Sequence, residues 1–343
     1  MSIITLRNGR RIGDFNKPYF IAELNTSHFG DLGIAKNMID TAKAAGCDCV
    51  KFQSWSADTL YSESFYQKNP ISKRIVKKFS LSEADLKDLS EYCTQVEMDF
   101  ASTPYSLDEA KFLALKCNVP FIKIASMELN NLPYLISLGE LGVPLILSTG
   151  MGTMTEIIDA VEAIQSTGNE KLIILHCTAV YPSPSNIIRL NNILGLRSEF
   201  PLHPIGYSDH SEGIEVPIAS VALGACLIEK HFTLDSSRIG MDNQMATEPD
   251  QMKEMVRACL SVHHALGGAD RILGVEEKEQ ISKMRRSLVA KTTLHIGEII
   301  NDGSVEFKRP GDGIPPSKYL DMVGKKVVNE INAGDLIRET DLS

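Results

Sequence analysis

Apolar and polar positions in the first three quarters of the chain follow two recurring patterns. Short apolar runs rich in β-branched residues predict strands, and these runs are "PYFIAE", "CDCVKFQ", "MDFAST", "PFIKIAS", "VPLILSTG", "KLIILHCT", "HPIGYSD" and "CLIEKHF". Segments with helical spacing lie between them, at residues 31–46, 81–95, 106–117, 154–168, 186–200, 215–225 and 248–268. Eight strands alternating with helices predict an α/β fold with a parallel sheet, and they fit a (β/α)8 TIM barrel.

A doubly wound open sheet is the alternative to the barrel. The glycine-rich turn with which such a sheet binds phosphate is absent after the first predicted strand. Its absence favours the barrel.

The pattern changes after residue 268. The stretch "ADRILGVEEKEQISKMRR" is charged and lacks aromatic residues, which is typical of a solvated linker or a short helix. Short strands and many glycines follow it. We therefore predict a barrel domain over 1–268, a linker over 269–282 and a small β-rich domain over 283–343. A domain of about 60 residues is marginally stable alone, so we expect it to dock on a partner surface.

Composition narrows the possible functions. The 343 residues are 43% hydrophobic, enough for a large core, and the formal net charge is -9. An acidic chain is poorly suited to bind nucleic acid or a membrane surface, because both require a basic face. There is no membrane-length apolar run and no secretory signal pattern, so we predict a cytoplasmic protein. The seven cysteines form no CxxC pair, and we expect reduced core residues.

Polar side chains stand at the end of nearly every predicted strand. They are Glu23, Lys51, Gln53, Ser102, Thr103, Lys123, Ser126, Glu128, Ser148, Thr149, His176, Thr178, Ser208, Asp209, His210, Glu229, Lys230 and His231. In a barrel, catalytic groups come from the C-terminal ends of the strands. We therefore expect these residues to share one site.

Lys51 and Lys123 lie inside apolar runs, where an unpaired ammonium group would be costly. Together with the hydroxyl groups of the neighbouring strand ends, they offer two cations and several donors to a phosphate or a carboxylate. A lysine that forms a Schiff base is the competing chemical role.

His210 and His231 end consecutive strands, which lie about 5 Å apart in a sheet. Two imidazoles so placed can share one metal ion and leave positions for water and substrate oxygens. The alternative is that both are merely polar strand ends. We expect the adjacent acids, Asp209 and Glu229, to orient the imidazoles.

Several longer segments carry a family resemblance. They are "IAELNTSHFGD", "AAGCDCVKFQ", "FASTPYSLDEAKFL", "FIKIASMELNNLPYL", "LILSTGMGTMTEI", "LHCTAVYPSP", "GYSDHSEG", "LGACLIEKHFTLD" and "KRPGDGI". In this order they span the whole chain, and it resembles the sialic acid synthase family. The resemblance implies condensation of phosphoenolpyruvate with an N-acylated amino sugar to a nine-carbon 2-keto acid. The tail resembles the SAF (antifreeze-like) domain of such synthases.

The resemblance also implies residue roles. Catalysis would depend on Glu23, Lys51, Lys123, His210 and His231, the two histidines binding a divalent cation, typically manganese, with magnesium or cobalt able to substitute. Phosphoenolpyruvate would be held by Lys51, Thr103, Lys123, Ser126, Ser148 and Ser208. The amino sugar would contact Glu23, Gln53, Glu128, Tyr181 and Asp242. Arg309 would reach the sugar's N-acyl group in the partner subunit's barrel, which implies a domain-swapped homodimer.

Two departures from the family pattern concern the substrates. Ala179 stands where many members carry an asparagine, and Met241 replaces a proline. The identity of the amino sugar therefore stays open. Other enzymes remain as alternatives, namely a different phosphoenolpyruvate-dependent aldose-condensing synthase or a Schiff-base aldolase. A non-catalytic sugar- or ice-binding protein is the alternative from another class.

Overall fold

The first part of the chain forms the predicted barrel. The computed structural model describes residues 2–343 and divides them into two compact units between Gly267 and Gly268. The barrel strands are β3 (Tyr19–Glu23), β4 (Cys49–Ser54), β5 (Asp99–Pro104), β6 (Ile122–Ile124), β7 (Leu145–Ser148), β8 (Leu172–Cys177), β9 (Ile205–Asp209) and β10 (Leu227–His231). They pair in parallel in the order β5-β4-β3-β10-β9-β8-β7-β6, and β5 lies next to β6. The prediction of a TIM barrel is confirmed.

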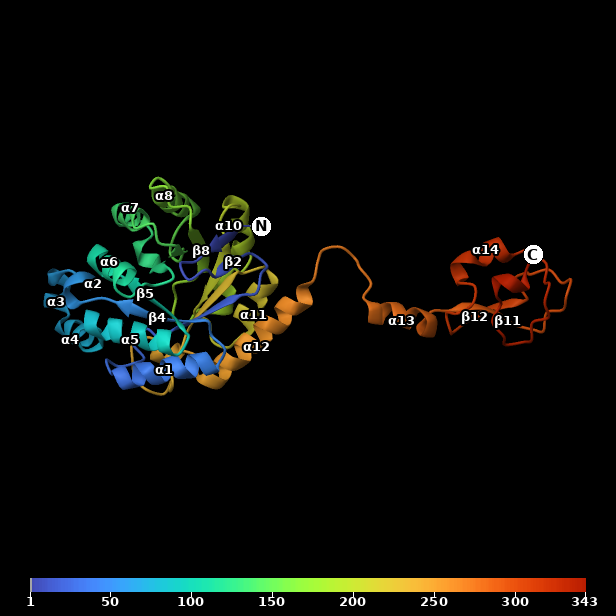
Figure 1. The fold of residues 1–343 in the computed structure, drawn as a ribbon, viewed down its shortest axis with the longest axis horizontal. Helices are drawn as coiled ribbons and strands as arrows, with labels where there is room; N and C mark the ends of the chain where they lie inside the picture. Colours follow the sequence, from blue (N-terminus) through green and yellow to red (C-terminus); the bar gives the residue numbers. More distant parts are fainter. Residues whose placement is uncertain (1) are drawn as a thin grey trace. The chain divides into compact units, whose positions relative to one another are not determined.

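Helices surround these strands (Figure 1). The larger ones are α1 (Leu32–Ala44), α5 (Glu83–Gln95), α6 (Leu107–Leu115), α7 (Leu132–Glu140), α8 (Met154–Gln165), α10 (Asn192–Glu199), α11 (Glu215–Ala222) and α12 (Pro249–Leu266). Local sequence explains where some begin: Ser82 and Thr153 form capping boxes at α5 and α8. Each helix predicted from the pattern is present. Helix α7 was not predicted.

Shorter elements complete the first unit. They are the antiparallel hairpin of β1 (Ile3–Thr5) and β2 (Arg11–Gly13), the helices α2 (Ala57–Leu60), α3 (Glu63–Lys68), α4 (Pro70–Phe79) and α9 (Ser185–Ile188), and the 3-10 turns η1 (Ser126–Glu128) and η2 (Asn243–Met245). Apart from α9, which falls within the predicted helical segment 186–200, none of these was predicted. The segment 57–79 follows β4 and adds three helices to one loop of the barrel.

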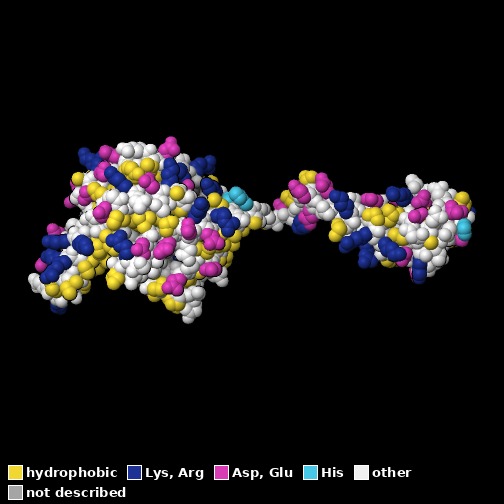
Figure 2. Space-filling view, turned by 90° about the horizontal axis from the view of Figure 1, so that it is seen from below, with side chains coloured by type: hydrophobic (Ala, Val, Ile, Leu, Met, Phe, Trp, Pro, Cys, Tyr) yellow, Lys and Arg dark blue, Asp and Glu magenta, His cyan; other side chains and the backbone are white. Residues whose placement is uncertain are grey.

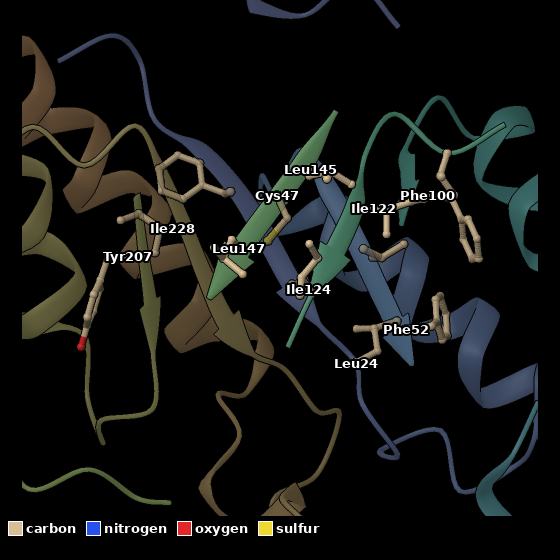
Figure 3. Close-up of a cluster of buried hydrophobic side chains, with 14 of the residues drawn as sticks. Leu24, Cys47, Phe52, Phe100, Ile122, Ile124, Leu145, Leu147, Tyr207 and Ile228 are labelled. Atoms are coloured by element: carbon tan, nitrogen blue, oxygen red, sulfur yellow. The ribbon is translucent and has the colours of Figure 1, made fainter. Parts of the chain in front are cut away.

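Alternation along each strand separates two apolar layers. Odd positions of β3, such as Ile21, belong to the barrel interior, whereas Phe20 and Ala22 pack in the layer between strands and helices. Figure 3 shows part of that outer layer, in which the rings of Phe52 and Phe100 stack with centroids 5.6 Å apart. We call the inward apolar residues the lower interior: Tyr19, Ile21, Cys49, Ala101, Phe121, Ile146, Ile173, Leu175 and Leu227.

The second unit is small and mainly non-helical. It contains α13 (Val275–Met284), β11 (Ser287–Ala290), β12 (Val305–Lys308), η3 (Pro316–Lys318), α14 (Tyr319–Met322) and η4 (Glu339–Asp341), with β11 and β12 antiparallel. Its core includes Leu288, Ile300 and Ile337. Most of α13 falls within the predicted linker over 269–282, and the backbone N–H of Gly311 donates to the carbonyl of Ser282 at 2.6 Å. Part of the predicted linker therefore packs within this unit.

Surface charges are mixed. On the face shown in Figure 2, Lys and Arg side chains are interspersed with Asp and Glu. Over residues 2–343 no helix combines the length and apolar character needed to cross a bilayer.

Candidate functional site

The inward face of the barrel changes from apolar to polar near the C-terminal ends of the strands. Two residues beyond Ile21, Cys49 and Ile146 stand Glu23, Lys51 and Ser148, which point the same way because the strand period is two. We call the inward polar layer the upper interior: Glu23, Lys51, Thr103, Lys123, Ser148, Ser208, Glu229 and His231, all buried.

A cavity of about 240 Å³ lies over this layer. Among the predicted site residues it is lined by Glu23, Lys51, Gln53, Thr103, Lys123, Ser126, Ser148, Tyr181, Ser208, His210 and His231. The structure thus brings together eleven of the fourteen predicted site residues. Glu128, Asp242 and Arg309 do not line it.

The same alternation excludes other polar strand ends from the site. Ser102, His176, Asp209 and Lys230 occupy positions one residue out of phase with the inward set. The ring of His176 bonds the carbonyl of Ile188 at 2.7 Å, and the ammonium group of Lys230 pairs with Asp209. The expectation of one shared site for all strand-end polar groups was therefore wrong for these four, and Thr149 and Thr178 do not line the cavity either.

Asp209 does not orient the imidazoles, contrary to expectation. Its carboxylate accepts hydrogen bonds from the Tyr207 hydroxyl at 2.9 Å and the Ser211 hydroxyl at 2.7 Å, besides pairing with Lys230. The physical reason is its outward position, one residue after Ser208. Asp209 fixes the loop that follows β9.

Lys51 and Lys123 are held by a buried network of carboxyl and hydroxyl groups. The Lys51 ammonium group pairs with Glu23 and donates to the hydroxyl of Thr103 at 3.0 Å. Lys123 donates to the hydroxyl of Ser148 at 2.5 Å. Both ammonium nitrogens lie 3.8 Å from the carboxylate of Glu229, and both lysines line the cavity, so a bound anion can contact both.

Glu229 lies between the two lysines. Its carboxylate oxygens are 3.8 Å from the ammonium nitrogens of Lys51 and Lys123, and the hydroxyl of Ser208 donates to it at 3.1 Å. The expectation that Glu229 orients the imidazoles was therefore wrong, because its inward position directs it to the lysines.

Burial and charge together set the protonation of this network. Burial would raise the pKa of Glu229, but Lys123 and Lys51 lower it below its usual value. Burial lowers the pKa of Lys123, whereas for Lys51 the charges of Glu229 and Glu23 outweigh burial and raise the pKa. The positive and negative charges of the network thus largely neutralise one another before any ligand binds.

The two predicted ligand histidines lie side by side. The ring centroids of His210 and His231 are 5.4 Å apart, and the ring of Tyr181 lies 4.2 Å from that of His210. The Nδ1 of His210 is 2.9 Å from the carbonyl oxygen of Thr178, which fixes Nδ1 as the donor and leaves Nε2 free. Burial and then the charge of His210 hold the pKa of His231 well below its usual value.

This donor set fits a divalent cation with exchangeable positions. No cluster of three or more His, Cys, Asp or Glu side chains in residues 2–343 has metal-binding geometry. Two imidazoles from His210 and His231 would therefore leave the other coordination positions to water and substrate oxygens, as Lewis-acid chemistry requires.

The remaining predicted residues surround the cavity or lie away from it. The Gln53 amide donates to Glu23 at 3.1 Å. Asp242, in the loop after β10, accepts from the amide of Asn25, and burial raises the pKa of Asp242. Glu128 accepts from the amide of Asn131 at 2.8 Å. Arg309 is an exposed residue of the second unit.

Sequence reasoning missed several lining residues. Tyr105, Met127, Met151 and Cys177 also line the cavity. Cys177 was grouped with the inert core cysteines, yet its sulfur is 3.8 Å from Nδ1 of His210. Burial opposes ionisation of this thiol, but the hydrogen bond with His210 and the charge of His210, together with smaller effects of Ser126 and Lys123, outweigh it and lower the pKa of Cys177. The signal that marks it is its inward position at the end of β8.

Comparisons with known proteins agree over nearly the whole chain. The model of the NeuB family matches residues 38–271 and that of the SAF domain matches residues 285–343. The chain is 36% identical over 334 residues to N,N'-diacetyllegionaminic acid synthase of Campylobacter jejuni, covering 94% of this chain and 99% of that protein. It is 32% identical over 340 residues to N-acetylneuraminate-9-phosphate synthase of Homo sapiens, covering 96% and 94%.

A solved structure gives the same result. The crystal structure of N-acetylneuraminic acid (sialic acid) synthetase from Leptospira borgpetersenii, in complex with citrate, superimposes with a TM-score of 0.75 at 32% identity. The match covers 82% of this chain and 95% of that one.

Proposed function

The chain belongs to the NeuB family and carries a SAF domain, and from this premise we propose that it is a nonulosonic acid synthase. It condenses phosphoenolpyruvate with an N-acylated amino sugar to a nine-carbon 2-keto acid and phosphate. The resemblance to sialic acid synthases inferred from the sequence is confirmed by these matches. The observation that carries the proposal is a cavity with two lysines at its base and two histidines beside them.

The lysines provide the site for phosphoenolpyruvate. Its phosphate and carboxylate need two positive groups and several donors, and the ammonium groups of Lys51 and Lys123 stand with the hydroxyls of Thr103 and Ser148. Charge-assisted hydrogen bonds of this kind are strong in a buried site. Because Glu23 and Glu229 already hold both lysines in place, little reorganisation accompanies binding.

The acceptor sugar binds with its aldehyde beside His210 and His231. A divalent cation held by these two residues would supply a Lewis acid for the aldehyde oxygen, and we propose manganese in this role. Glu23 and Gln53, which are hydrogen-bonded to each other, would contact the sugar hydroxyls. The ring of Tyr181 lies beside both histidines and would contact the sugar there.

The reaction balances without a redox partner. A bond forms between C3 of phosphoenolpyruvate and the aldehyde carbon, whose oxygen takes up a proton. Water adds at C2 and supplies the proton that the aldehyde oxygen takes up. Phosphate then leaves with the oxygen of the C2–O bond and the second proton of the water, and C2 becomes the keto carbon. The lysines neutralise the phosphate throughout, which stabilises it as the leaving group.

Phosphate release tests the proposal. Purified protein with manganese, phosphoenolpyruvate and an N-acylated amino sugar should release phosphate only when all three are present, and EDTA should stop it. Borohydride treatment with pyruvate should leave the protein unmodified. Covalent capture of pyruvate on Lys123 or Lys51, with turnover insensitive to EDTA, would instead support a Schiff-base aldolase.

A domain-swapped homodimer is part of the proposal, as is a cytoplasmic location. In such a dimer Arg309 contacts the sugar's N-acyl group in the partner subunit's barrel. We expect Arg309→Ala to raise the KM for the sugar by about tenfold and to leave the KM for phosphoenolpyruvate unchanged. Steady-state kinetics with each substrate varied in turn measures both, and a rise confined to phosphoenolpyruvate contradicts the swapped arrangement.

A further inference from the structure

Two acidic residues that we expect to contact the sugar belong to loops that start side by side. Strands β3 and β10 pair in parallel with Glu23 opposite His231, so the loops that follow them leave the barrel next to each other. Glu23 ends β3, and Asp242 lies in the loop after β10. The two residues are far apart in the sequence, so contacts between the two loops must set how their carboxylates are placed.

Asn25, in the loop after β3, is hydrogen-bonded to both carboxylates. Its backbone N–H donates to Oε1 of Glu23 at 3.1 Å, and its side-chain amide donates to Oδ2 of Asp242. Among residues 2–343, Asn25 is the only residue that donates a hydrogen bond to the Asp242 carboxylate. The side chain of Asn25 therefore orients this carboxylate.

The Asp242 carboxylate lies on the histidine side of the site. Burial raises the pKa of Asp242, and the charge of His210 lowers it. Burial and the charges of Cys177 and Asp242 raise the pKa of Tyr181. Charges shift a pKa in this way only when the groups are neighbours. Asp242 does not line the cavity itself, but it lies close to His210 and Tyr181, which do.

Asn25 carries two costs that packing alone does not explain. It is 3% exposed, and its φ of 41° lies in the left-handed region, which is strained for a residue with a side chain. Its side-chain oxygen is buried without a hydrogen-bond partner in the described part of the chain, which is also costly. Backbone strain of this kind is typical of functional sites. The contact with Asp242 is the interaction that the asparagine side chain makes in return.

Other contacts anchor the loop after β10 independently of Asn25. The guanidinium carbon of Arg238 lies 3.8 Å from the ring centroid of Phe29, in the loop after β3. Within the loop after β10, the amide of Asn243 donates to the carbonyls of Asp235 and Arg238, both at 2.8 Å. Loss of the Asn25 side chain should therefore release one carboxylate without unfolding the loop.

We propose that Asn25 is a positioning residue for the acceptor sugar, an inference that rests on the proposed synthase function. Asn25 holds the carboxylates of Glu23 and Asp242 so that both face the same sugar. Hydroxyl and N–H groups of the sugar then meet acceptors that are already in place, which lowers the cost of ordering these acceptors on binding. Asn25 acts through the two acids and takes no part in bond formation.

Asn25→Gly tests this role. Glycine keeps the backbone N–H that contacts Glu23 and suits a φ of 41°, so only the contact with Asp242 is lost. The KM for the sugar should rise by about tenfold, whereas kcat and the KM for phosphoenolpyruvate should stay within about twofold of the parent values. A KM for the sugar that stays within about twofold of the parent value overturns the role.

The assay measures phosphate release by full-length protein with manganese. N-acetylmannosamine, N-acetylmannosamine 6-phosphate and 2,4-diacetamido-2,4,6-trideoxymannose would be compared first, and the acceptor with the highest kcat/KM would serve for all variants. If the parent protein turns over none of the three, the proposed synthase function is overturned, and this inference with it. If the parent protein is active, the variants test Asn25 alone.

Thr26→Val is the matched control. Thr26 lies in the same loop, is 1% exposed, and its hydroxyl has no hydrogen-bond partner within residues 2–343. Valine has nearly the same shape, so the KM for the sugar should stay within about twofold of the parent value. A rise as large as that of Asn25→Gly overturns the role, because the effect would then come from the loop as a whole.

A double-mutant cycle tests whether Asn25 acts through Asp242. Asp242→Ala should raise the KM for the sugar by at least about tenfold, and adding Asn25→Gly should raise it by less than about twofold more. Effects that multiply in the double variant overturn the proposal. If Asn25→Gly fails the check of folding by urea titration, Asn25→Asp keeps the size of the side chain and sets two carboxylates against each other. Its KM for the sugar should rise by at least about tenfold, and an unchanged KM overturns the role.

Discussion

The lower and upper interiors of the barrel stand on the same strands and are equally buried, but they differ in chemistry. On β10, Leu227 belongs to the lower interior, and Glu229 and His231 belong to the upper. On β3, Ile21 and Glu23 show the same change within two residues. Strand geometry therefore does not distinguish the two layers. It places both inward, and the side chains alone decide which layer stabilises the fold and which binds substrate.

The two layers contribute to stability in opposite ways. Burying the apolar groups of the lower interior contributes about 25 cal/mol for each Å² removed from water. Burying the ammonium and carboxyl groups of the upper interior costs free energy, which their mutual pairing only partly offsets. The lower interior therefore stabilises the barrel, and the buried charges of the upper interior destabilise it. Substitutions in the two layers should separate activity from stability.

The largest expected effect is a loss of turnover without a loss of stability. His231→Ala removes one of the two imidazoles that we propose to hold the divalent cation, and kcat should fall by at least about a thousandfold, because Lewis-acid catalysis supplies several kcal/mol. The midpoint of urea unfolding should stay the same or rise. Phosphate release and urea titration measure the two quantities. Turnover within tenfold of the parent protein would contradict the ligand role.

Breaking one ion pair of the upper interior should reduce both activity and stability. Lys123→Met leaves Glu229 with a single cationic neighbour, and removing one partner of a buried pair costs about 4 kcal/mol. Urea unfolding measures this loss, and the KM for phosphoenolpyruvate should rise as well.

The double variant is the control for that interpretation. Adding Glu229→Gln to Lys123→Met removes the uncompensated charge and should recover at least about 1 kcal/mol of the unfolding free energy. If the losses of unfolding free energy from the two substitutions simply add, Lys123 and Glu229 are not coupled. The buried charges of the upper interior then do not destabilise the barrel in the way we describe.

A substitution in the lower interior should do the reverse. Ile173→Ala creates a cavity among fully buried side chains, and the free energy of unfolding should fall by about 3 kcal/mol. The kcat of the folded protein should remain within about twofold of the parent value, since Ile173 does not line the catalytic cavity. Urea unfolding and phosphate release at saturating substrates check both. A large loss of kcat would show that the two layers are not independent.

The sequence was sufficient to predict the barrel, but it was insufficient to predict which strand residues point into it. Eight apolar runs of strand length, separated by helical spacing, predict the fold because few other arrangements bury them all. Barrel strands are buried on both faces, however, so they show no alternation from which an inward position could be read. Asp209 and Ser208 therefore look equivalent in the sequence, although only Ser208 faces the cavity.

Other omissions have equally local causes. Helix α7, "LPYLISLGE", is apolar at most positions, so its buried face with Leu135 and Leu138 does not stand out in the sequence as a separate stripe. The helices α2 and α3 have one buried residue each, so no apolar stripe marks them. Helix α4 does carry apolar residues at helical spacing, Ile71, Ile75, Val76 and Phe79, and could have been predicted. Met127 and Met151 are exposed, and an exposed methionine carries no signal of function in a sequence.

His28 gives the smallest predicted effect and the sharpest test of the comparison, because it is a titratable residue that the fold treats as an apolar one. It is 1% exposed, its ring lies 5.9 Å from that of Phe52, and its Nδ1 accepts the backbone N–H of Gly30 at 3.0 Å. Burial lowers the pKa of His28 to about 4.

Above the unfolded-state pKa of about 6.5 the residue is neutral in both states and contributes no pH dependence. As the pH falls below about 6.5, the unfolded chain binds a proton that the folded chain does not, so the free energy of unfolding decreases, by about 2 kcal/mol at pH 5. The decrease ends near the folded-state pKa.

Urea unfolding of the parent protein and of His28→Gln at pH 7 and pH 5 measures this contribution. The parent should lose about 2 kcal/mol more than the variant between the two pH values, because glutamine does not titrate. Equal losses would mean that His28 accepts a proton in the folded protein as readily as in water. In that case the buried surroundings of His28, in the loop after β3, would not disfavour its charged form.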